Sequence, residues 1–137
     1  MNIFVVDPDP ASAAICLPDK LVVKMPLESA QMLSTAHRVL DGEQASADKG
    51  VYKVAMKNHP CTIWTRETSQ NYRWLYYHFF ALCKEYETRY GREHLCFTKL
   101  HKPLACLPKN ITLISILFAY IDLNHYLYKM LQFHLRL

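Results

Sequence analysis

Residues 65–90, TRETSQNYRWLYYHFFALCKEYETRY, carry the longest helical pattern in the chain. Apolar and aromatic positions recur there every three or four residues over about five turns, namely Tyr72, Leu75, Tyr76, Phe79, Leu82, Cys83, Tyr86 and Tyr90. Trp74, Tyr77 and Phe80 widen this apolar stripe, so several neighbouring elements must cover it. Gly91 directly follows Tyr90 and suits the left-handed conformation at which many helices end. We therefore predict a long central helix over about residues 65–90.

The composition is that of one packed domain. The chain has 137 residues, of which 51% are hydrophobic and 20% charged, and it contains only 3 glycines. These values exclude disordered and low-complexity classes and predict a single all-α domain over residues 1–137. The five cysteines are an odd number without CxxC spacing, so we expect reduced thiols and a cytoplasmic location, in the host cytoplasm if a phage encodes the chain.

The segments before the central helix supply the remaining elements. Residues 1–6 are apolar and β-branched, which indicates a short strand or an extended arm that ends at residues 7–10. Residues 19–40 have helical spacing, and Pro26 makes them either one kinked helix or two helices. Residues 41–50 are polar and without periodicity, so we predict a mobile loop.

The C-terminal segment, residues 111–137, differs from the rest in composition. Its first part is nearly all apolar and predicts a helix, but Asp122 and Asn124 interrupt the run before it reaches the length of a membrane span. We expect no membrane insertion. The helix is either buried or pairs with a second copy of the chain, which would make a homo-oligomer.

Charge is distributed unevenly along the sequence. Residues 1–64 hold six Lys or Arg against seven Asp or Glu, whereas residues 65–137 hold ten against five. A basic half with interspersed aromatic residues is typical of a phosphate-binding face. A sequence pI of 8.8 is also common among proteins that bind nothing anionic, so this reading stays open.

The first candidate for chemistry is the pair Lys24 and Glu28. On a continuous helix the two side chains lie on one side, because they are four residues apart. An amine there could form a Schiff base at a sugar C1′ while the carboxylate transfers protons. Lys20 and Arg38 would extend the same surface towards DNA. The alternative is a solvated Lys–Glu pair without a role.

A second candidate lies in the turn ahead of the long helix. Pro60 keeps His59 out of helical geometry, and Trp64, Arg66 and Asn71 follow closely. The start of a helix offers free N–H groups, so a phosphate could bind there beside Arg66 and Arg73. The alternatives are that His59 and Asn71 satisfy backbone groups and Trp64 is a staple, or that this cluster is the pocket of a small-molecule enzyme.

The sequence gives no support for a metal or a cofactor. The spacing of the histidines and cysteines does not match that of a zinc site, and GxGxxG, P-loop and GxSxG motifs do not occur. We expect neither.

Several strings resemble known proteins. Residues 19–38 (DKLVVKMPLESAQMLSTAHR), 58–67 (NHPCTIWTRE), 71–74 (NYRW) and 85–91 (EYETRYG) resemble a family of uncharacterised phage and marine-bacterial proteins over residues 1 to about 110. The order of elements is also similar to that of pyrimidine-dimer DNA glycosylases of the endonuclease V type. These proteins are small, helical and basic, with a glutamate on an early helix and a histidine before a long helix.

This resemblance implies a DNA-repair enzyme acting on double-stranded DNA. Glu28 would be the catalytic carboxylate, with Arg38 and His59 at the DNA. We therefore take Glu28, Lys24 and His59 as the candidate catalytic residues. Those glycosylases use the α-amine of a small residue exposed by methionine removal, whereas here Met1 precedes Asn2, which usually retains the methionine. The nucleophile is then either an N-terminal amine or an amine of the Lys20 and Lys24 helix. The rival hypothesis is a non-enzymatic interaction module that associates through its C-terminal helix.

Overall fold

The computed structural model describes residues 1–114 and forms an all-α bundle in that range, without a strand. Its helices are α1 (Pro10–Ile15), α2 (Asp19–Asp41), α3 (Glu43–Asp48), α4 (Pro60–Glu67), α5 (Ser69–Tyr90) and α6 (Leu95–Ala105). The predicted all-α class is therefore confirmed. Residues 1–5 form an extended arm rather than a strand.

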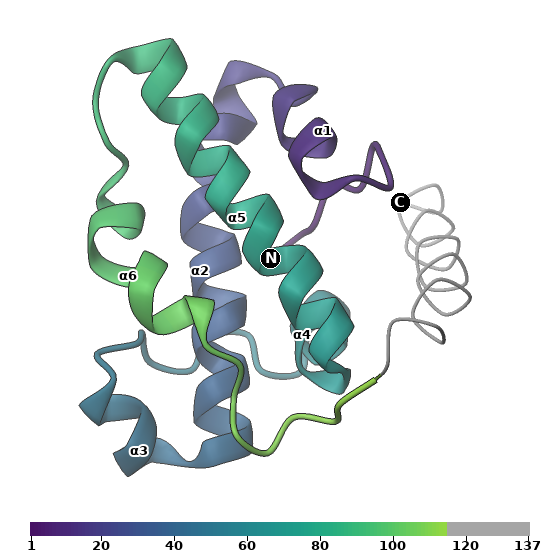
Figure 1. Cartoon of the computed structure of the whole chain (residues 1–137), viewed down its shortest axis with the longest axis vertical. Coiled ribbons are helices and arrows are strands. Elements are labelled where there is room, and N and C mark those ends of the chain that lie inside the picture. The colour runs from purple at the N-terminus through teal and green to yellow at the C-terminus, as the bar shows by residue number, and fades with distance from the viewer. Residues whose placement is uncertain (115–137) are drawn as a thin grey trace.

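The helix α5 is central, as the sequence predicted. It packs against α1, α2, α4 and α6, and Figure 1 shows it crossing the molecule in front of α2. Leu75, Phe79 and Leu82 on its inner side are fully buried. Gly91 takes the left-handed conformation (φ 68°) and its N–H bonds the Glu87 carbonyl, which confirms the predicted helix end.

The prediction of one helix over residues 65–90 is wrong at its start. Thr68 is extended (φ −142°, ψ 156°) and separates α4 from α5. Its hydroxyl accepts a hydrogen bond from the Asn71 N–H at 3.1 Å. A threonine side chain that caps the following turn competes with helix continuation, and the period of the pattern alone does not reveal this.

The structure corrects the prediction for residues 41–50 and decides between the two alternatives for residues 19–40. The predicted loop at residues 41–50 contains the helix α3, which begins after Gly42 (φ 90°) and buries Ser46. Pro26 does not divide residues 19–40, because α2 continues through it as one helix. A proline removes one backbone donor, but buried Pro26 lies inside α2 without ending it.

The predicted helix over residues 111–137 does not begin at Ile111. Residues 112–114 are extended and lie across the start of α5, where the Ser69 N–H donates to the Thr112 carbonyl at 2.8 Å. The Ile114 N–H in turn donates to the Ser69 hydroxyl. The rest of that predicted helix, and with it the predicted oligomer contact, lies outside the described residues.

Candidate active site

An amine and carboxylate centre forms where the N-terminal arm meets α2. The Asn2 N–H donates to Glu28 Oε2 at 3.1 Å, and the Met1 amine lies 3.7 Å from the same oxygen. Lys24 Nζ lies 3.2 Å from Oε1, one turn earlier on the continuous helix. The Glu28 side chain is 13% exposed, so a largely buried carboxylate has one amine at each oxygen.

The arm that carries the terminal amine is held at both ends. Ile3 is buried in the same core cluster as Cys61 of α4. Burial raises the pKa of the Cys61 thiol, while the Ile3 N–H and the terminal amine oppose this rise and Glu28 adds to it. Further along, Trp74 Nε1 donates to the Pro8 carbonyl at 2.8 Å. The amine is therefore positioned by packing and not only by its ion pair.

His59 lies in the turn before α4, as the sequence predicted. It is the residue that precedes the helix, and its Nδ1 accepts a hydrogen bond from the Cys61 N–H at 3.2 Å. This is the capping role that the sequence left open as an alternative. Through Cys61, two residues later, the turn is connected to the surroundings of Glu28.

The predicted DNA-contacting residues do not all lie in one place. Lys20 is exposed on α2, near Lys24. Trp64 and Asn71 are buried where α4 meets α5, and Asn71 Nδ2 donates to the Trp64 carbonyl at 2.9 Å. Arg66 is half-buried, and its guanidinium donates to the Lys57 carbonyl at 2.8 Å.

Arg73 is exposed on α5 and lines a shallow pocket between α5 and the start of α1. The pocket has a volume of about 280 Å³, and its other lining residues are Pro8, Asp9, Pro10, Gln70, Trp74 and Tyr77. The described structure thus brings Lys20, Lys24 and Glu28 together on α2 and places Arg73 on another element.

Arg38 is held by partners within the chain. Its guanidinium donates to the carbonyls of Tyr52 and Val51 at 2.9 and 2.8 Å, and it pairs with the Glu43 carboxylate at 2.7 Å. These bonds fix residues 51–52 against the C-terminal half of α2. A planar guanidinium reaches all three groups, which a lysine ammonium cannot do.

We expect Arg38→Lys to lower the free energy of unfolding by about 1 to 2 kcal/mol, because buried carbonyls lose their donors. Arg73→Lys is the matched control, since Arg73 is exposed on α5, and it should change stability by less than about 0.5 kcal/mol. Urea unfolding followed by circular dichroism measures both. If the two variants are equally stable, the hydrogen bonds of Arg38 to residues 51–52 do not contribute to the stability of the fold.

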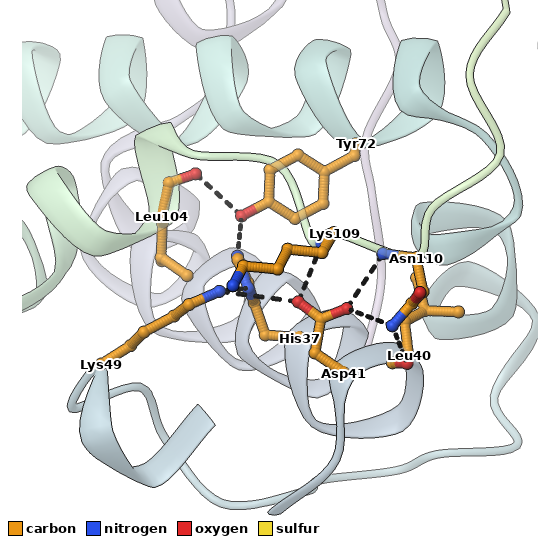
Figure 2. A network of polar contacts seen from close by, with 8 residues as sticks. All are labelled: His37, Leu40, Asp41, Lys49, Tyr72, Leu104, Lys109 and Asn110. Atoms are coloured by element: carbon orange, nitrogen blue, oxygen red, sulfur yellow. Dashed lines mark hydrogen bonds and ion pairs between the residues drawn. The ribbon is translucent and has the colours of Figure 1, made fainter. Parts of the chain in front are cut away.

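A separate buried polar network lies at the C-terminal end of α2, as Figure 2 shows. His37 Nε2 lies 2.8 Å from the Tyr72 hydroxyl, which donates to the Leu104 carbonyl at 2.7 Å. The ring Nε2 is therefore the donor to Tyr72, and Nδ1 accepts from Lys49 Nζ at 3.3 Å. Burial, followed by the charge of Lys49, lowers the pKa of His37 to about 4, so the ring is neutral at pH 7.

Asp41 continues this network towards the end of the described chain. Its carboxylate accepts the backbone N–H groups of Lys109 and Asn110 at 2.8 and 3.0 Å, and Lys49 Nζ lies 3.5 Å away. Burial raises the pKa of Asp41, but these hydrogen bonds and Lys49 together lower it below its usual value. The network ties α2, α3 and residues 109–110 together.

Sequence reasoning missed several of these residues. Cys61 was treated only as one of several buried thiols, and the His37, Asp41 and Lys49 set was not singled out. Their one sequence signal is the four-residue spacing of His37 and Asp41, which places both on one side of a helix.

Residues 1–114 hold neither a cluster of metal ligands nor a candidate membrane span. They contain no group of three or more His, Cys, Asp or Glu that could hold a metal ion. None of their helices combines the length and the hydropathy that a membrane span needs.

Comparison with known proteins supplies the family. The profile of the pyrimidine dimer DNA glycosylase family matches residues 1–98, a range that includes the terminal amine, Glu28 and the His59 turn. Curated proteins gave no match, and solved structures gave none either. The match covers most of the chain and agrees with the resemblance found in the sequence. The chain belongs to the pyrimidine dimer DNA glycosylase family.

Proposed function

We propose that this chain is a DNA glycosylase and abasic-site lyase that acts on damaged pyrimidines in double-stranded DNA. The observation that carries the proposal is the approach of the terminal amine to Glu28 at 3.7 Å, together with the Asn2 N–H at 3.1 Å. Removal of Met1 would leave the Asn2 nitrogen as the amine at the same carboxylate oxygen. Either N-terminus therefore presents an amine to Glu28.

The chemistry needs one amine and one proton-transferring carboxylate. The unprotonated amine attacks the sugar C1′, and the bond from C1′ to the base breaks with its electron pair leaving on the base, which takes up a proton. The bond from C1′ to O4′ then breaks, O4′ leaves with the electron pair and takes up a proton, and a protonated imine forms between C1′ and the amine nitrogen. Glu28 accepts the proton that the amine releases and stabilises the positive charge on the sugar.

Lys24 has a second role in this proposal. Its ammonium lies 3.2 Å from Glu28 Oε1 and is largely exposed, so it is available both to a phosphate and to the carboxylate. Lys20 is exposed one turn earlier on α2. Together they give the α2 surface a positive charge that suits the DNA backbone. Arg66 and Arg73 are candidates for contacts further along the strand.

Borohydride trapping tests the proposal directly. The reagent reduces the imine to a stable amine, so the wild-type chain incubated with a duplex that contains an abasic site should become covalently attached to the DNA. Duplexes without an abasic site or a dimer serve as the control substrate. If no adduct forms with abasic or dimer-containing duplex, the proposed function is wrong.

Mass spectrometry of the trapped adduct identifies the nucleophile. We expect the sugar fragment on the N-terminal peptide, and we expect Lys24→Gln to form the adduct while binding duplex more weakly as salt is raised. Reductive methylation restricted to the terminal amine should abolish the adduct. A fragment on Lys24, with loss of trapping in Lys24→Gln, would transfer the nucleophile to α2.

A further inference from the structure

Met56 has an unusual backbone and an unusual environment. Within residues 1–114 it is the one residue other than glycine with a positive φ, at 46°. Its apolar side chain is also 61% exposed. A non-glycine residue in the left-handed region is strained, and such residues gather at functional sites, so the position calls for an explanation from its surroundings.

The turn of Met56 lies on the same side of α2 as the amine and carboxylate centre. Ala55, the preceding residue, exchanges hydrogen bonds with the Thr35 hydroxyl at 3.1 and 3.3 Å. Thr35 follows Glu28 by seven residues, which is two turns along one face, or roughly 10 Å. On its other side the turn leads into α4, whose Cys61 is buried in the same core cluster as Ile3 of the N-terminal arm.

The turn is held firmly while the Met56 side chain stays outside. The His59 N–H donates to the Met56 carbonyl at 2.9 Å, and Arg66 donates to the Lys57 carbonyl at 2.8 Å. Arg38 fixes the incoming segment at Tyr52. The backbone is therefore anchored on both sides of Met56, and its side chain is exposed to the solvent.

The neighbours of Met56 suit a nucleic acid more than a protein partner. Lys53 and Lys57 flank it and are exposed, and Lys20 and Lys24 are exposed on the part of α2 before Glu28, further from the turn. Apolar side chains that are inserted between base pairs unstack them and bend the duplex, while lysines beside them bind the phosphates. The amine reaches C1′ of a nucleotide inside the duplex only when the duplex is bent or a base leaves the stack at that position.

We propose that Met56 inserts into the base stack next to the damaged pyrimidine, with Lys53 and Lys57 at the flanking phosphates. Insertion would hold the duplex open so that C1′ reaches the amine at Glu28. The inference rests on the proposed function for its substrate, but it concerns the opening of the duplex and not the covalent step.

The fluorescence of 2-aminopurine placed opposite a stable abasic analogue measures this opening, because the base brightens when it leaves the stack. The wild-type chain and Met56→Leu, which keeps an apolar side chain, should both raise the fluorescence. Met56→Asn tolerates the left-handed backbone but cannot insert an apolar group, so its fluorescence rise should be about tenfold smaller. Its melting temperature should equal or exceed that of the wild type, which separates this effect from unfolding.

Borohydride trapping on parallel duplexes that carry a natural abasic site or a pyrimidine dimer, in place of the stable analogue, distinguishes the two proposals. Met56→Asn should still trap a pre-formed abasic site within about twofold of the wild type, but excise a pyrimidine dimer about tenfold more slowly. An equal fluorescence rise for Met56→Asn and the wild type would overturn the inference, whether or not an adduct forms. A rise that depends on Met56 without any adduct would support insertion and reject the proposed chemistry.

Discussion

Glu28→Gln should lower the single-turnover rate of pyrimidine excision by about 10³-fold, because general-base assistance and charge stabilisation contribute on that order. The glutamine keeps an oxygen that can accept from the Asn2 N–H, so the arm should remain in place. The variant loses the negative charge that faces the terminal amine and Lys24. Duplex affinity should therefore stay equal or increase slightly.

Single-turnover excision from a dimer-containing duplex and duplex affinity are the two measurements. Glu85→Gln is the matched control, because Glu85 is also mostly buried and pairs with an arginine, Arg89, at 2.9 Å. It should change the rate by less than about twofold, as Glu85 lies at the far end of α5. A rate for Glu28→Gln within tenfold of the wild type would remove Glu28 from the chemistry.

The free energy of unfolding should begin to fall as the pH drops below 6.5, well above the pH at which carboxylates titrate, because of buried His37. His37 has its pKa lowered from 6.5 to about 4, first by burial and then by Lys49. Above pH 6.5 the ring is neutral in both the folded and the unfolded chain. Between pH 6.5 and 4 the unfolded chain binds a proton that the folded chain does not, so stability falls by roughly 3 kcal/mol across that window.

Urea unfolding at a series of pH values measures this loss, and NMR titration of the His37 ring measures the pKa itself. His78 contributes in the same direction, because burial lowers its pKa as well. Lys49→Met removes the cation 3.3 Å from Nδ1, so it should raise the pKa of His37 and flatten the pH dependence. A His37 ring that titrates near pH 6.5 in the wild type would contradict the described network.

The local features of this chain followed from its sequence. The spacing of Leu75, Phe79 and Leu82 determined the inner face of α5, because side chains three and four residues apart share one side of a helix. The same rule placed Lys24 beside Glu28, and the chemistry of Gly91 determined where α5 ends. These predictions depend on residues within one or two turns of each other, and helix geometry relates such residues directly.

Tertiary structure decided what lies far apart in sequence. The Asn2 nitrogen reaches Glu28 across 26 residues only because Ile3 is buried against α4, and no periodicity encodes that contact. Packing also directs Arg38 to the backbone of residues 51–52 and gives Met56 its left-handed turn. The sequence around a cationic or apolar side chain does not show whether that side chain is buried or exposed. Only the packing of the folded chain determines whether it faces a carbonyl, a carboxylate or the solvent.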